Sequence, residues 1–118
     1  MDKGIELYKE FIDNFVTMSE NCVDAVSVKK GNVVGCQAQE IGINDVLKKL
    51  SSEDREKLSQ FISDVYSSGI FDVLDNLEWL RECREMEMKI DNAVLSMGKF
   101  EGIQNDYIGR KAGWQWTE

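Results

Sequence analysis

The side chains most able to bind or react lie near the carboxyl end of the chain. Asp106 and Arg110 are four residues apart, and Trp114 and Trp116 follow them closely. A carboxylate and a guanidinium at this spacing can pair along a helix or close a turn through two parallel hydrogen bonds. Tryptophan and arginine also contribute most of the binding energy in many protein interfaces. Two hypotheses compete: Arg110 anchors an anion or a partner beside the indoles, or it bridges Asp106 or Asp72 while the indoles cover the core.

Both hypotheses require that the carboxyl end is held in place. Chain termini usually fray unless packing or hydrogen bonding ties them down. Burying one indole removes on the order of 150–250 Å² from water, which is enough to fix a terminus. Two tryptophans at this end therefore predict that it is docked, either on the chain's own core or on a partner.

A second group of candidate residues is acidic. Its members are Asp72, Asp75, Glu78, Glu82, Glu85 and Glu87. Oxygen ligands of this kind suit calcium or magnesium, and an acidic surface suits a basic protein. The spacing does not match an EF-hand loop, and acids at helical spacing are typical of a solvated face with local ion pairs. We therefore predict no metal site.

The absence of histidine excludes several catalytic mechanisms. Ser–His and Cys–His nucleophiles need an imidazole base, and imidazole is also the commonest metal ligand in proteins. The three cysteines are widely spaced without a Cys-x-x-Cys pair, so the sequence indicates neither a zinc site nor a thioredoxin-type site. We expect Cys22 to be buried, whereas Cys36 lies in a glycine-bounded loop where it could be exposed. The sequence predicts a protein that is not an enzyme and binds no cofactor.

Length and composition indicate one globular domain, residues 1–118. Hydrophobic residues make up 42% of the chain and charged residues 31%, which is typical of a folded protein. The formal net charge of −8 argues against nucleic acid, because phosphate binding requires a basic surface, and it is compatible with a basic protein partner. No segment approaches the roughly 20 apolar residues of a membrane span, and the first residues do not resemble a signal peptide. We expect a cytoplasmic protein that binds neither nucleic acid nor membranes.

Hydrophobic periodicity predicts about four helices. Apolar residues recur every three or four positions over residues 5–27, followed by a break at Gly31 and a loop over 33–42. A short helix is expected over 44–50, with Asn44 as its N-cap. The next helix starts after Ser51 and ends with Gly69 as its C′ residue, and another follows over 71–85. The helix predicted between Ser51 and Gly69 has one apolar stripe, which consists of Leu58, Phe61, Ile62, Val65 and Tyr66.

The pattern changes near Met86. Residues 87–91 alternate between polar and apolar, Asn92 marks a turn, and residues 93–96 can return as a second strand. Residues 106–108 are predicted as a last short strand. The sequence therefore indicates a mainly α (α+β) fold, with about four helices packed as one domain and a small C-terminal antiparallel β element.

Three segments of the chain together resemble a known family. They are residues 50–55, residues 68–74 and residues 106–118, the last of which contains Asp-Tyr-Ile-Gly-Arg and then Gly-Trp-Gln-Trp. In order and spacing they are similar to a family of small bacterial proteins of unknown function that end in Asp-Tyr/Phe-x-x-Arg and then Gly-x-x-Trp. The family carries histidine and proline where this chain has Phe71 and Thr117. The resemblance implies an α+β domain and assigns no activity.

These observations favour a non-catalytic protein-interaction module. Its contact surface would be the tryptophan–arginine end or the acidic helix, and one version is an inhibitor or immunity-type protein that neutralises a basic enzyme. A self-complementary surface would instead indicate a homodimer. The alternative is a small-ligand-binding protein or an enzyme, and it requires Asp72, Asp106 and Arg110 to converge on one pocket.

Overall fold

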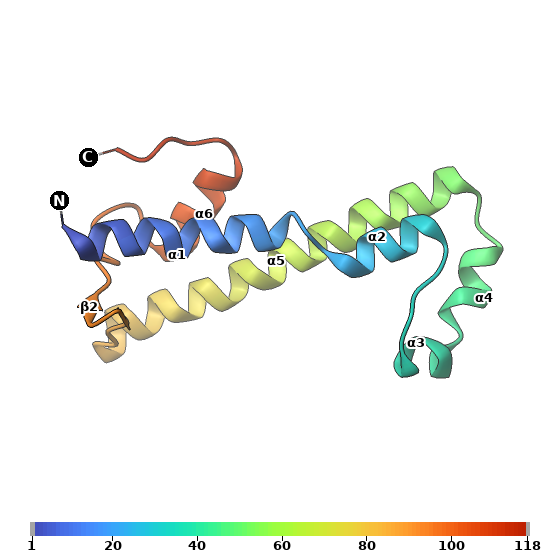
Figure 1. The fold of residues 1–118 in the computed structure, drawn as a ribbon, viewed down its shortest axis with the longest axis horizontal. Helices are drawn as coiled ribbons and strands as arrows, with labels where there is room; N and C mark the ends of the chain where they lie inside the picture. Colours follow the sequence, from blue (N-terminus) through green and yellow to red (C-terminus); the bar gives the residue numbers. More distant parts are fainter. Residues whose placement is uncertain (1, 118) are drawn as a thin grey trace. The chain divides into compact units, whose positions relative to one another are not determined.

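The computed structural model describes residues 2–117 and contains helices joined by short segments (Figure 1). The elements are α1 (Lys3–Ser19), α2 (Val23–Lys30), α3 (Cys36–Ile41), α4 (Ile43–Lys48), α5 (Ser52–Arg84), β1 (Lys89–Ile90), β2 (Ala93–Val94) and α6 (Ile103–Lys111). The predicted fold class is confirmed, because the described chain is mainly helical and has a small antiparallel sheet near its carboxyl end.

The chain forms two compact units. Unit 1 consists of the segments up to Ser19 and from Ser68 onwards, and unit 2 consists of Glu20–Ser67. The first half of α5 therefore belongs to unit 2 and its second half to unit 1.

Unit 1 has an apolar core built by α1, the second half of α5, the segment after β2, and α6. Its buried residues are Tyr8, Ile12, Ile70, Leu74, Leu95, Met97, Ile103 and Tyr107. Each helix contributes a pair four residues apart, a spacing that places both side chains on one helix face. α1 packs directly against α6 (Figure 1).

The β-hairpin of unit 1 lies against the first turn of α1. Its strands are antiparallel, with Lys89 opposite Val94. The two loop residues, Asp91 and Asn92, have φ values of 51° and 64°, as a type I′ turn requires. A side chain at Gly4 would overlap the carbonyl oxygen of Val94, so glycine is what allows the close approach. The predicted hairpin is confirmed.

Unit 2 has a smaller core, and hydrogen bonds from side chains to the backbone join its segments. Its buried apolar side chains are Cys22, Ala25, Val28, Ala38 and Leu47. The Ser59 hydroxyl on α5 donates to the Ala25 carbonyl of α2 at 2.7 Å. The Asn44 side chain accepts from the amide of Val33 at 2.7 Å and donates to its carbonyl at 2.9 Å. Such bonds fix the backbone of segments that contribute little apolar burial.

The prediction of one helix over residues 5–27 is wrong, because this segment divides into α1 and α2. The Ser19 hydroxyl donates back to the Val16 carbonyl at 2.7 Å at the end of α1, a bond that competes with helix continuation. Cys22 then adopts an extended backbone before α2 begins at Val23. Its predicted burial is confirmed, as is the break at Gly31, which takes the left-handed conformation at the end of α2.

The predicted helix end at Gly69 is also wrong. α5 continues without interruption for 33 residues. Its predicted start is correct, since the Ser51 hydroxyl accepts a hydrogen bond from the Asp54 amide at 3.1 Å. Glycine costs about 1 kcal/mol relative to alanine inside a helix. That penalty is too small to end a helix whose neighbouring residues, such as Ile70, pack into a core.

Two shorter elements also differ from the predictions. The expected loop over 33–42 contains α3, and the expected strand over 106–108 lies within α6. Gly42 precedes α4 in a left-handed conformation, so Asn44 lies inside the helix rather than at its N-cap. The side chain of Asn44 still forms hydrogen bonds with backbone groups, but these belong to Val33 and not to the first turn of α4.

Candidate functional site

Asp13 on α1 holds the carboxyl-terminal segment in place. The Arg110 guanidinium donates to both carboxylate oxygens of Asp13, from Nε at 2.7 Å and from Nη2 at 3.2 Å. The indole Nε1 of Trp116 donates to the same carboxylate at 3.1 Å. Arg110 also donates from Nη1 to the carbonyl oxygen of Trp114 at 2.6 Å. The terminus is therefore docked on the chain's own first helix.

Aromatic rings enclose this terminus. The Trp116 ring lies with its centroid 4.9 Å from Phe100, 5.2 Å from Trp114 and 6.0 Å from Tyr8. The Arg110 guanidinium carbon lies 5.3 Å from the centre of the Trp116 ring, which adds a cation–π contact. Both tryptophans are half-buried, and the rings cover one side of the core.

Asp106 forms a separate buried pair with Tyr8. The Tyr8 hydroxyl donates to Asp106 Oδ2 at 2.5 Å, and the Glu101 amide donates to Oδ1 at 3.0 Å. Burial raises the pKa of Tyr8 well above its usual range, and the hydrogen bond to Asp106 raises it further. Burial also raises the pKa of Asp106, against the lowering effect of its two donors. The pair joins α1 to α6 inside the core.

The structure does not bring Asp72, Asp106 and Arg110 to one pocket. Asp106 bonds to Tyr8, Arg110 bonds to Asp13, and Asp72 lies exposed on α5. A cavity of about 270 Å³ beside Asp106 is lined by Glu101, Asn105, Asp106, Gly109 and Trp114. Neither Asp72 nor Arg110 is part of that lining. The convergence that a ligand pocket built on these three residues requires is therefore missing.

The acidic run is mostly a solvated helix face. Among its members, Glu78 is buried and accepts two hydrogen bonds from Arg81, at 2.7 and 2.9 Å. The other five are exposed. In the described part of the chain, no group of three or more cysteine or acidic side chains is placed to hold a metal ion.

Asp13 is the residue of this cluster that sequence reasoning missed. Its partner Arg110 is 97 positions away, and one aspartate on an amphipathic helix gives no signal of such a distant contact. Tyr8 lies in the segment whose apolar spacing predicts a helix, but its hydrogen bond to Asp106 was not predicted. The hypothesis that Arg110 bridges Asp106 or Asp72 identified an ion pair of the correct type with the wrong partners.

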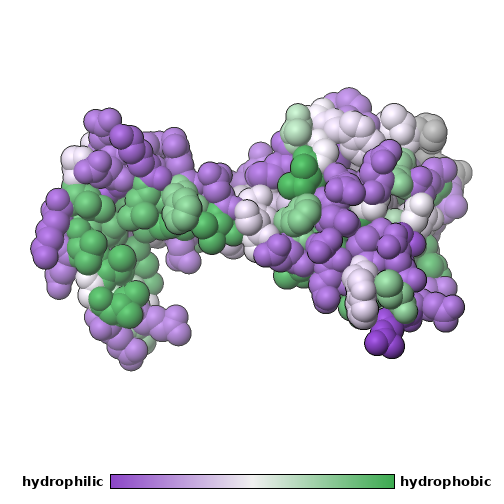
Figure 2. Space-filling view, turned by 180° about the vertical axis from the view of Figure 1, so that it is seen from behind, coloured by the Kyte–Doolittle hydropathy of each residue, from purple (hydrophilic) through white to green (hydrophobic). Residues whose placement is uncertain are grey.

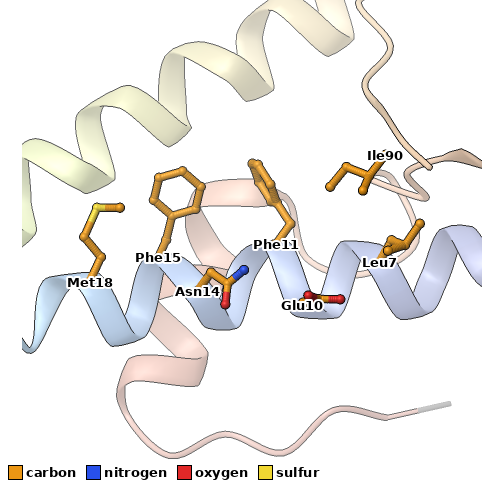
Figure 3. Close-up of a pocket in the computed structure, with 7 residues that line it drawn as sticks. All are labelled: Leu7, Glu10, Phe11, Asn14, Phe15, Met18 and Ile90. Carbon is orange, nitrogen blue, oxygen red and sulfur yellow. The ribbon is translucent and has the colours of Figure 1, made fainter. Parts of the chain in front are cut away.

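Each unit has an apolar groove at its surface. The first, in unit 1, has a volume of about 310 Å³ and is lined by Leu7, Glu10, Phe11, Asn14, Phe15, Met18 and Ile90. Figure 3 shows Phe11, Phe15 and Met18 projecting from one side of α1, with Ile90 of the hairpin at the end of their row. The Phe11 and Phe15 rings are in edge contact, with centroids 5.0 Å apart.

The second groove, in unit 2, is larger. It has a volume of about 600 Å³ and includes Val34, Cys36, Ile41, Ile43, Leu58 and Ile62 in its lining. Figure 2 shows hydrophobic side chains gathered over this unit. Cys36, whose exposure the sequence left open, is exposed. The stripe predicted on α5 is largely uncovered here, because Phe61, Val65 and Tyr66 are all exposed.

The fold and these surfaces define a class: an acidic, mainly α protein with a small β-hairpin and open apolar grooves. The chain belongs to a family of unknown function (DUF6547), whose family model matches residues 1–118. No curated protein and no solved structure matched the chain. Over the described residues, no helix combines the length and hydrophobicity that crossing a membrane requires.

Proposed function

We propose that this protein is a non-catalytic interaction module, and that the groove along α1 is its contact site for another protein. The observation that carries the proposal is the row of Leu7, Phe11, Phe15 and Met18 along this groove: the first three are partly buried against the core, and Met18 is 47% exposed. These residues span eleven positions, or about 16 Å of helix. That length matches about three turns of a partner helix laid in the groove, a common mode of peptide recognition.

Charge indicates the chemistry of that partner. Unit 1 contains 14 acidic and 8 basic residues, a formal net charge of −6. The charged residue in the groove lining is Glu10. An acidic field attracts and orients basic ligands. The expected partner segment is therefore an amphipathic helix with an apolar stripe and lysine or arginine beside it, and an inhibitor of a basic enzyme is one form that this function can take.

The carboxyl-terminal residues act in this proposal by holding α1. Asp13 and Phe11 are two positions apart, so their side chains point to different sides of the helix. Arg110 and Trp116 engage Asp13 and leave the groove side open. Their role is to fix the helix that presents the groove, instead of touching the partner.

A displayed library of helical peptides tests the proposal. Peptides selected on the intact protein should carry apolar residues at helical spacing beside lysine or arginine, and they should lose at least about tenfold in affinity on Phe11→Glu. The matched control is Ile108→Glu, since Ile108 is an exposed apolar residue on α6 of the same unit. Selected peptides that bind Phe11→Glu as well as wild type, or that lack basic residues, would contradict the proposal.

A further inference from the structure

We infer that the apolar face of unit 2 is an interface between two copies of this chain. The face consists of the α5 stripe and the two most exposed residues beside the groove. The exposed fractions are 85% for Val34, 75% for Ile41, 64% for Phe61, 54% for Val65 and 37% for Tyr66. Residues at 58, 61, 62 and 65 follow the spacing of a buried helix face, yet this chain leaves part of that face open.

The exposed area is large enough for a pair of copies. A fully exposed side chain of this size presents about 150–200 Å², so these five residues leave on the order of 600 Å² of apolar surface on each copy. Two copies together would bury about 1,200 Å², which reaches the range of specific protein interfaces. A patch of this size is at the upper end of the largest apolar patches on single chains, about 300–600 Å², and such patches are often functional.

Charge favours a second copy over a basic partner at this face. Unit 2 contains 8 acidic and 6 basic residues, a formal net charge of only −2, whereas unit 1 carries −6. Two such faces meet with little repulsion. A basic partner would be drawn to unit 1 instead. This interface is therefore distinct from the groove proposed above as the binding site, and it would make the module bivalent.

The stripe also fixes the direction of pairing. Lys57 and Asp64 are seven positions apart, and by helical geometry they flank the same edge of the stripe. When two α5 helices pack antiparallel about a two-fold axis near Phe61, Lys57 of each copy lies opposite Asp64 of the other. Contacts of this reciprocal kind are those that a two-fold interface makes, and the groove beside Leu58 can receive the second copy's Phe61.

Measuring the mass of the full-length protein in solution tests the inference. Sedimentation equilibrium at up to about 100 µM should give twice the 13.5 kDa of one chain. Val65→Lys should raise the dimer dissociation constant by at least about tenfold. Val73→Lys is the matched control, because Val73 is 56% exposed on the same helix but belongs to unit 1. A monomer at all concentrations, a larger open assembly, or a dimer that survives Val65→Lys would overturn the inference.

A charge exchange tests the direction of pairing without disturbing the apolar face. Lys57→Asp and Asp64→Lys should each weaken the dimer about threefold, and the double variant should recover wild-type affinity. Both sites are exposed, and Lys57 makes a surface pair with Glu53 at 3.7 Å. The single variants should therefore fold even if Val65→Lys does not. A double variant that is weaker than both single variants would overturn the antiparallel arrangement.

Discussion

The two units of this chain bury the apolar faces of their helices in different ways. Unit 1 closes an apolar core of large side chains with an aromatic cluster and a buried Tyr8–Asp106 pair. Unit 2 buries mainly small side chains, and hydrogen bonds from the side chains of Asn44 and Ser59 to the backbone hold its short helices. Hydrophobic burial scales with the area removed from water. Unit 1 should therefore be the more stable of the two. The stability of unit 2 should depend more on single hydrogen bonds and on the second copy that we propose covers its apolar face.

The largest expected effect concerns the closure of unit 1. Trp116→Ala removes a half-buried indole and leaves the Asp13–Arg110 pair more exposed to water. We expect a loss of about 3 kcal/mol in the free energy of unfolding, since truncating a buried aromatic usually costs about 3–5 kcal/mol. Urea unfolding measures this loss directly.

Trp79 provides the matched control for that measurement. It is 49% exposed on α5 and packs against the Arg84 guanidinium, 5.5 Å from its ring centre. Trp79→Ala should cost less than about 1 kcal/mol, as exposed contacts of this kind contribute little. Equal losses for the two variants would mean that the carboxyl-terminal indole does not close the core.

A smaller and more local effect is expected in unit 2. Asn44→Ala removes both hydrogen bonds to Val33 and leaves that backbone without its side-chain partner. The expected cost is about 1–2 kcal/mol. Amide hydrogen exchange should show faster exchange in α3 and α4 while the core amides of α1 and α6 keep their protection.

The same hydrogen-exchange measurement also tests whether the two units differ in stability. Asn14→Ala is a suitable control, because Asn14 is an exposed amide at the α1 groove of unit 1. It should leave exchange in both units near the wild-type level. If Asn44→Ala accelerates exchange equally in unit 1 and unit 2, the units do not differ in the way that their cores indicate.

The sequence predicted the parts of the fold that depend on local signals. The Ser51 cap, the break at Gly31 and the turn at Asn92 were identified, because each depends on neighbouring residues alone. The division near Ser19 was not, since the apolar spacing continues across it. Whether a stripe is buried is also not a local property, and Phe61 and Val65 follow the same pattern as buried residues while lying exposed.

The sequence indicated part of the carboxyl-terminal cluster but not its contacts. Arg110, Trp114 and Trp116 do form one cluster, as their shared terminus indicated. Asp13 completes it from the other end of the chain, and only the tertiary fold determines that pairing. The groove along α1 was not predicted, because the apolar spacing over residues 5–27 does not distinguish Phe11 and Phe15, which are partly buried at the groove, from Tyr8 and Ile12, which are fully buried.

The smallest expected effect is a gain in stability at Gly69, where the sequence and the structure disagree. A side chain added at Gly69 meets nothing within 4 Å, and the residue lies inside α5 next to the boundary between the two units. Gly69→Ala should therefore stabilise the protein by about 0.5–1 kcal/mol, because alanine has the higher helix propensity and restricts the unfolded chain. If the helix ended here with a left-handed glycine, the same change would destabilise it by a similar amount or more.

Gly4→Ala is the contrasting variant, since its side chain would overlap Val94 and must lower stability. Thermal unfolding of the two variants, compared with wild type, should give shifts of opposite sign, and a loss at Gly69 would contradict a helical backbone at this position.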